Sequence, residues 1–230
     1  MVFIHGAGGT HKVWRYQTSM FSGSLALDLP GHPRGVGCNT IQAYAQFVTD
    51  AIKERGLASV VLVGHSMGGA ITIEIALSHP KFLVGIALVG SGARLRVASV
   101  IKDEVARDYA HAAEVIAQWA YSPKTDAKLR KASVQELLEV PAEVTNGDFQ
   151  ACDNFDKMNE ISRIDLPTLL VCGEDDALTP VKYSRFLKER IRDARLVIIP
   201  GAGHSVMLEK PDELNNVLLS FLAETHLSHI

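Results

Sequence analysis

Residues 60–70 read VVLVGHSMGGA and join an apolar run to a helix-like pattern through a serine flanked by glycines. Four consecutive apolar residues, 60–63, are typical of a strand that is buried on both faces. Gly64 and Gly68 stand two residues either side of Ser66, where a sharp turn needs neighbours without side chains. We therefore predict a strand, a strained turn and a helix, with the Ser66 hydroxyl at the apex. The alternative is a glycine-rich turn in which the serine is incidental.

A second glycine-rich stretch lies near the start of the chain. The short apolar run Val2 to Ile4 leads into HGAGG at residues 5–9. Three glycines in five residues predict a loop whose backbone can approach a ligand closely. A phosphate-binding loop is the alternative, but the stretch lacks the Lys-Ser/Thr ending of a P-loop and the full dinucleotide fingerprint.

The rest of the chain alternates between apolar runs and helical periodicity. Thr40 is a good N-cap for a helix that we expect over residues 41–55, with Gly56 as its stop. Alternating strands and helices with continuously apolar strands predict one α/β domain over residues 1–230, built on a parallel sheet covered on both faces. The further strands are expected at residues 25–29, 83–89, 168–172 and 195–199.

The alternation breaks between about residues 97 and 150. This region has helix-like stretches at residues 112–120 and 133–138 and no strand pattern. We expect a short helical cap at residues 93–165, inserted after the strand Leu83 to Val89. Trp119 and Tyr121 within it either line a substrate pocket or form the small core of the cap itself.

Composition excludes several classes of protein. The 230 residues carry a formal net charge of −3 and show no cluster of Lys and Arg, so we expect no nucleic-acid partner. Cys38, Cys152 and Cys172 are widely spaced, which fits a reducing compartment and gives no metal-site spacing. No apolar run approaches the length of a membrane span, and residues 1–6 do not read as a signal peptide. We expect a cytoplasmic protein with no metal.

The serine turn and the HGAGG loop together resemble the α/β-hydrolase superfamily, in the branch of small serine esterases and carbon–carbon bond hydrolases. The resemblance implies that Ser66 is a nucleophile and that an acid and then a histidine follow it in the chain. Asp176 lies in Gly-x-x-Asp after the penultimate strand, and His204 follows the last strand in GAGH. The resemblance also implies an oxyanion hole formed by the backbone N–H groups of Ala7 and Met67.

Nine histidines compete for the role of the base. The family order disfavours the histidines that precede the acid. Others are disfavoured by their place: two belong to the glycine-rich motifs, one lies in the insertion and two lie in a terminal tail. The stretch LALDLPGH at residues 25–32 resembles a family motif in which Asp28 and His32 are structural. The disfavoured histidines are His5, His11, His32, His65, His79, His111, His226 and His229.

The resemblance also bears on the sheet. The family usually has two strands ahead of the one that opens this sequence, so we expect about six strands, all parallel. By the family strand order, the strand at residues 25–29 lies at an edge, and a monomer or a homodimer paired through that edge is compatible with it.

The resulting functional prediction is a carboxylesterase-like serine hydrolase that cleaves small carboxylic esters through an acyl-enzyme intermediate, without a cofactor. One alternative is a carbon–carbon bond hydrolase or lyase, or an acyltransferase, that uses the same triad. Another is a non-catalytic relative that binds a small ligand.

Overall fold

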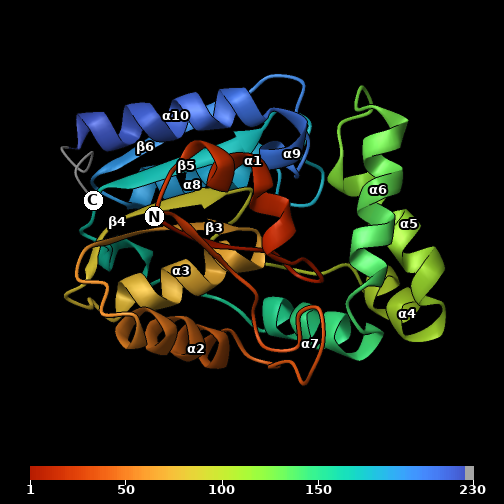
Figure 1. Cartoon of the computed structure of the whole chain (residues 1–230). Coiled ribbons are helices and arrows are strands. Elements are labelled where there is room, and N and C mark those ends of the chain that lie inside the picture. The colour runs from red at the N-terminus through yellow and green to blue at the C-terminus, as the bar shows by residue number, and fades with distance from the viewer. Residues whose placement is uncertain (226–230) are drawn as a thin grey trace.

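The computed structural model describes residues 1–225. Six parallel strands form one sheet in the order β2-β1-β3-β4-β5-β6, which confirms the predicted α/β-hydrolase sheet and places β2 at an edge (Figure 1). The strands are β1 (Val2–Ile4), β2 (Leu25–Leu27), β3 (Val60–His65), β4 (Leu83–Val89), β5 (Thr168–Gly173) and β6 (Ala194–Ile199).

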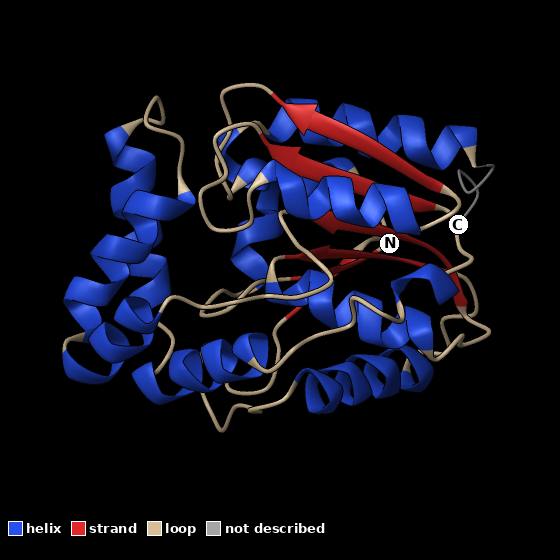
Figure 2. Ribbon diagram, turned by 180° about the vertical axis from the view of Figure 1, so that it is seen from behind, coloured by secondary structure: helices blue, strands red, loops and turns tan. Residues whose placement is uncertain are grey.

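Helices cover both faces of this sheet (Figures 1 and 2). One apolar core lies between the sheet and α2 (Ile41–Glu54), α3 (Met67–Leu77) and α8 (Val181–Arg190). A second core lies on the opposite face, under η1 (His11–Trp14), α1 (Arg15–Met20), α9 (Val206–Glu209) and α10 (Pro211–Glu224). Burial on both faces explains why the central strands are continuously apolar rather than alternating.

The helix α2 begins where the N-cap residue Thr40 predicts its start. Thr40 caps α2 through its hydroxyl, which accepts a hydrogen bond from the Ala43 N–H at 3.2 Å. The apolar side of α2 faces the core, with Tyr44, Val48 and Ile52 fully buried. Such an amphipathic face contributes most of the stability of a surface helix.

Four helices between β4 and β5 lie beside the carboxyl ends of the strands (Figures 1 and 2). We refer to them together as the cap helices. They are α4 (Ser99–Arg107), α5 (Tyr109–Ala120), α6 (Ala127–Leu138) and α7 (Ala142–Asp153), and a short turn, η2 (Ile161–Arg163), leads back to the sheet. Periodicity predicted parts of α5 and α6. The two predicted stretches include neither α4 nor α7. In α7 a fully buried aspartate, Asp148, interrupts the apolar pattern.

One expectation is corrected. The strand predicted over residues 25–29 ends at Leu27, because the Leu29 N–H donates to the His5 side chain at 3.1 Å instead of to another strand. Within residues 1–225 the three cysteines are free thiols, and no helix combines the length and the apolar character needed to cross a membrane.

Candidate active site

Ser66 occupies the turn between β3 and α3 in a backbone conformation that L-residues rarely adopt, with φ 52° and ψ −115°. The flanking residues must be glycines, because a side chain at either position would collide with nearby backbone atoms. A Cβ at Gly64 would lie 2.2 Å from the Gly68 carbonyl oxygen, and one at Gly68 would lie 2.3 Å from the Ile4 carbonyl oxygen. The Ser91 hydroxyl donates to the Ser66 carbonyl oxygen at 2.8 Å and helps to hold the turn. The strained serine turn predicted from the sequence is confirmed.

Asp176 and His204 meet beside this turn. His204 Nδ1 lies 2.9 Å from Asp176 Oδ2, and both side chains are buried. The β5–α8 loop carries Asp176, and the β6–α9 loop carries His204, so the carboxyl ends of adjacent parallel strands bring them together. Ser66 and His204 line the same two cavities.

The Asp176 carboxylate is held by its own loop. Oδ1 accepts the backbone N–H groups of Leu178 and Thr179 at 2.9 and 2.8 Å, and Oδ2 accepts the Thr179 hydroxyl at 2.8 Å. Burial would raise the pKa of Asp176, but His204 and these hydrogen bonds outweigh it, so the pKa is lowered. Thr179 Oγ1 also lies 3.2 Å from His204 Nδ1, a contact that sequence reasoning missed.

His65, which precedes the serine, supports His204 from the other side. Its ring lies 4.6 Å from the His204 ring, centroid to centroid, and its Nε2 lies 3.1 Å from the His204 carbonyl oxygen. Since a carbonyl oxygen only accepts, Nε2 carries a proton and donates. Burial lowers the pKa of His65 well below its usual range, and the neighbouring His204 adds to this. His65 is thus a neutral side chain that holds the backbone of His204 in place.

The HGAGG loop after β1 passes over the serine turn. A Cβ at Gly6 would lie 3.1 Å from Ser66 Cβ. Among the described residues, the Ala7 N–H donates to no protein acceptor, and the Met67 N–H is the first of α3 and has no partner within that helix. These two groups are therefore available to an oxygen atom next to Ser66.

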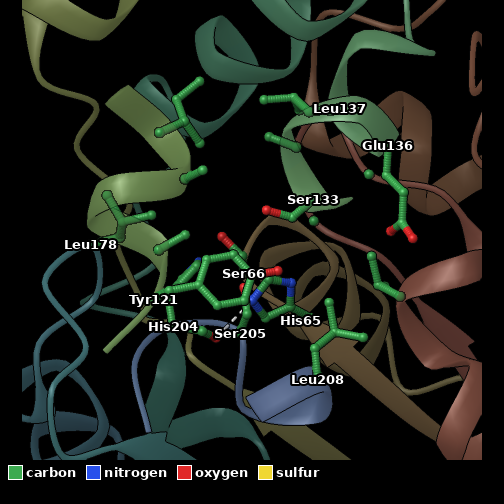
Figure 3. A pocket seen from close by; sticks show the side chains of 18 of the residues that line it. His65, Ser66, Tyr121, Ser133, Glu136, Leu137, Leu178, His204, Ser205 and Leu208 are labelled. Atoms are coloured by element: carbon green, nitrogen blue, oxygen red, sulfur yellow. Dashed lines mark hydrogen bonds between the residues drawn. The ribbon is translucent and has the colours of Figure 1, made fainter. Parts of the chain in front are cut away.

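Two cavities meet at Ser66 and His204. The first is drawn in Figure 3 and is lined by Ser66, His65 and His204, with Tyr121 and Leu178 beside them. The second extends from the same pair along α4 and α5, past Trp119. Tyr121 packs into the core of the main sheet, and Trp119 packs against the cluster formed by α4 and α5. The two aromatic residues thus line different cavities and also belong to different apolar cores.

The remaining candidates lie elsewhere. Asp175, next to Asp176, is half-buried and accepts the hydroxyl of Ser122, in the loop between α5 and α6, at 2.6 Å. His11 pairs with Asp28 at 2.8 Å on the surface. The rings of His5 and His32 are in contact, with their centroids 4.7 Å apart and their planes tilted by 57°. His226 and His229 lie outside the described residues.

Comparisons with known proteins bear on this arrangement. A putative carbamate hydrolase, RutD, from Cronobacter turicensis is 26% identical over 247 residues, which covers 97% of this chain and 90% of the relative. A pimeloyl-[acyl-carrier protein] methyl ester esterase from Yersinia enterocolitica is 24% identical, with 98% and 94% covered. A thermophilic esterase of known structure superposes with a TM-score of 0.89 at 33% identity, over 97% of this chain and 89% of that chain.

A match to a family model assigns the chain to a protein family. The model described as the alpha/beta hydrolase family matches residues 1–217, nearly the whole chain. The match includes the serine turn, the HGAGG loop, the cap helices and both loops that carry Asp176 and His204. This protein belongs to the alpha/beta hydrolase family.

Proposed function

We propose that this protein is a serine hydrolase that cleaves small carboxylic esters through an acyl-enzyme intermediate. The observation that carries the proposal is the 2.9 Å contact between Asp176 and His204 beside a serine with positive φ. A serine hydroxyl is a weak nucleophile unless a base is within reach, and the base needs an acid partner to hold its tautomer. Relatives named as ester and carbamate hydrolases support the same class.

The chemistry assigns one role to each residue. The Ser66 hydroxyl oxygen attacks the ester carbonyl carbon while His204 takes the proton. The oxyanion is bound by the N–H groups of Ala7 and Met67, which are oriented before the reaction starts. The intermediate then expels the alcohol, which receives the proton from His204, and leaves an acyl group on Ser66. Water repeats the sequence and releases the acid, while Asp176 stabilises the imidazolium in both steps.

The two cavities suggest the shape of the substrate. Both open onto Ser66, and both are largely apolar: the first includes Leu137 and Leu208, and the second includes Val97 and Ile101. We propose that the acyl group occupies one and the alcohol group the other, which favours esters with apolar groups on both sides of the carboxyl. In this proposal the segment 93–165 acts as a cap that shapes both cavities, with Trp119 and Tyr121 as substrate contacts.

We place the enzyme in the cytoplasm as part of the same proposal. The three free cysteines fit a reducing compartment. Fractionation of the native cells tests this: the protein should be recovered in the cytoplasmic fraction, and recovery from an exported fraction would contradict the proposal.

The function is tested with p-nitrophenyl esters of graded acyl length. Sustained turnover, many product molecules per enzyme, supports a hydrolase and excludes a protein that only captures ligand. Adding an alcohol as a competing acceptor separates hydrolysis from acyl transfer, since a transferase would divert most acyl groups into a new ester. No turnover with any ester, together with cleavage of a vinylogous diketone, would assign the triad to carbon–carbon bond hydrolysis.

A further inference from the structure

The cap helix α7 carries a carboxylate, Asp148, that is fully buried at the edge of the active site. Its oxygens receive hydrogen bonds from three distant segments. Oδ2 accepts the Gly8 N–H and His32 Nε2–H, both at 2.8 Å, and Oδ1 accepts the Tyr44 hydroxyl at 2.5 Å. A buried charge is costly unless it is paired and fully hydrogen-bonded, and this carboxylate meets both conditions.

The partner of Asp148 is a charged histidine. His32 Nδ1 lies 2.9 Å from the Pro30 carbonyl oxygen and 3.3 Å from that of Leu29, and these atoms only accept. Since Nε2 faces a carboxylate, both ring nitrogens donate, which requires the imidazolium form. Burial would lower the pKa of His32, but the hydrogen bond and the charge of Asp148 outweigh it and raise the pKa.

Three contacts fix the peptide groups on both sides of Ala7. The Gly6 carbonyl oxygen accepts the Gly9 N–H at 3.1 Å and lies 2.8 Å from His5 Nδ1, which carries a proton because Nε2 accepts a backbone N–H. In a trans peptide the Gly6 C=O and the Ala7 N–H point in opposite directions, so fixing the carbonyl aims the N–H. The next peptide, Ala7–Gly8, is fixed by the bond from the Gly8 N–H to Asp148.

The cap helices also leave no room for a side chain at Gly8. Gly8 has φ +63°, and a Cβ there would lie 2.4 Å from Leu137 Cδ1 of α6 and 3.1 Å from Thr145 Oγ1 of α7. The loop that carries the Ala7 N–H is therefore shaped by the cap as well as by the sheet.

We propose that Asp148 is a positioning residue for hydrolysis: from α7 it holds the Ala7–Gly8 peptide, with His32 as its counter-ion, and so keeps the Ala7 N–H directed at the oxyanion. The inference rests on the proposed serine hydrolase function. It makes the placement of the cap part of the catalytic geometry, in addition to its role in shaping the cavities.

The test compares three substitutions on a small ester. Asp148→Ala removes the acceptor of the Gly8 N–H and should lower kcat by roughly 10- to 100-fold, less than the loss of a whole oxyanion donor, while KM changes by less than about threefold. Asp148→Asn keeps an oxygen that accepts this N–H and should recover at least about fivefold in kcat over the alanine variant. Tyr44→Phe, the matched control, removes one bond to the same carboxylate and leaves the Gly8 bond intact; it should lower Tm but keep kcat within about threefold.

A second measurement reads the oxyanion hole itself. A trifluoromethyl ketone forms a tetrahedral adduct with a catalytic serine, so its inhibition constant in Asp148→Ala should weaken by about the same factor as kcat/KM falls. If Asp148→Ala does not fold, the double variant His32→Phe/Asp148→Leu replaces both buried charges by apolar groups and should show the same loss of kcat. Wild-type kcat and ketone affinity in a folded variant without the carboxylate would overturn the inference. A wild-type protein that neither turns over esters nor binds the ketone would overturn the proposed function instead.

Discussion

The backbone of Gly90 lies against the imidazole of His204, so closely that a Cβ at Gly90 would stand 3.1 Å from His204 Nδ1. The same Cβ would lie 3.2 Å from Asp176 Oδ2, the other atom of the pair. Gly90 follows β4 with φ +54°, a conformation that favours glycine. The end of β4 thus forms the surface against which the acid–base pair is packed.

Gly90→Ala is expected to lower kcat by about 10- to 100-fold, because the new methyl group displaces the imidazole from a geometry that tolerates little error. Steady-state kinetics on a p-nitrophenyl ester measure the loss. Gly56→Ala is the matched control: Gly56 has φ +64°, and a Cβ there has no atom within 4 Å, so this variant carries similar backbone strain with no contact to the site. Equal kcat for the two variants would contradict the role of Gly90.

Asp176→Asn is expected to reduce kcat on the order of ten-thousand-fold while the fold is kept, since the amide presents the wrong partner to His204. Asp175→Asn is expected to cost no more than about tenfold, because Asp175 bonds to Ser122 of the cap and not to His204. Circular dichroism confirms folding for both variants. A larger kcat loss in Asp175→Asn than in Asp176→Asn would show that the wrong carboxylate has been assigned.

The stability of the protein should fall as the pH is lowered from 7 to 4. Burial lowers the pKa of His5 to about 4, so the unfolded chain takes up a proton in this range before the folded chain does. From His5 alone the free energy of unfolding should drop by about 3 kcal/mol, and the lowered pKa of His65 adds to it. His32 contributes with the opposite sign, since its raised pKa gives stability at low pH that is lost as the pH rises through that pKa.

Urea unfolding at a series of pH values measures this dependence. His5→Gln keeps a side chain that can donate and accept but does not titrate, and its stability should change less steeply with pH than that of the wild type. The same slope in both proteins would show that His5 is not the group responsible.

Trp119→Ala and Tyr121→Ala should change selectivity for different parts of the ester, because the two side chains line different cavities. One variant should alter the dependence of KM on acyl length with p-nitrophenyl esters. The other should alter the dependence on alcohol length with alkyl acetates. Both profiles remaining as in the wild type would show that these residues only fill the apolar cores in which they pack.

The sheet and the sharp turn at Ser66 could be predicted from the sequence, because their signals are local. The apolar run ending at Gly64 predicts a buried strand, and the glycines around Ser66 predict the sharp turn. The choice of Asp176 and His204 came instead from the resemblance to the family, in which an acid follows the penultimate strand and a histidine follows the last. The strand and the turn each need fewer than about ten residues of context.

The supporting residues could not be read in this way. Gly90 and Thr179 act on His204 from 114 and 25 positions away along the chain, and no local pattern marks either contact. Asp148 is 140 residues from Gly8, and in the sequence it reads as a polar residue of an undistinguished stretch. A buried carboxylate is recognised only when the fold shows its donors.

The central claim is that Ser66 is the nucleophile, and covalent labelling tests it most directly. A fluorophosphonate reacts with an activated serine and leaves a stable phosphonyl group that occupies the position of the tetrahedral intermediate. Intact mass spectrometry of the wild type should show one added phosphonyl group, and Ser66→Ala should show none, while circular dichroism confirms that the variant is folded. Equal labelling of the wild type and Ser66→Ala would contradict the assignment of Ser66 and the mechanism built on it.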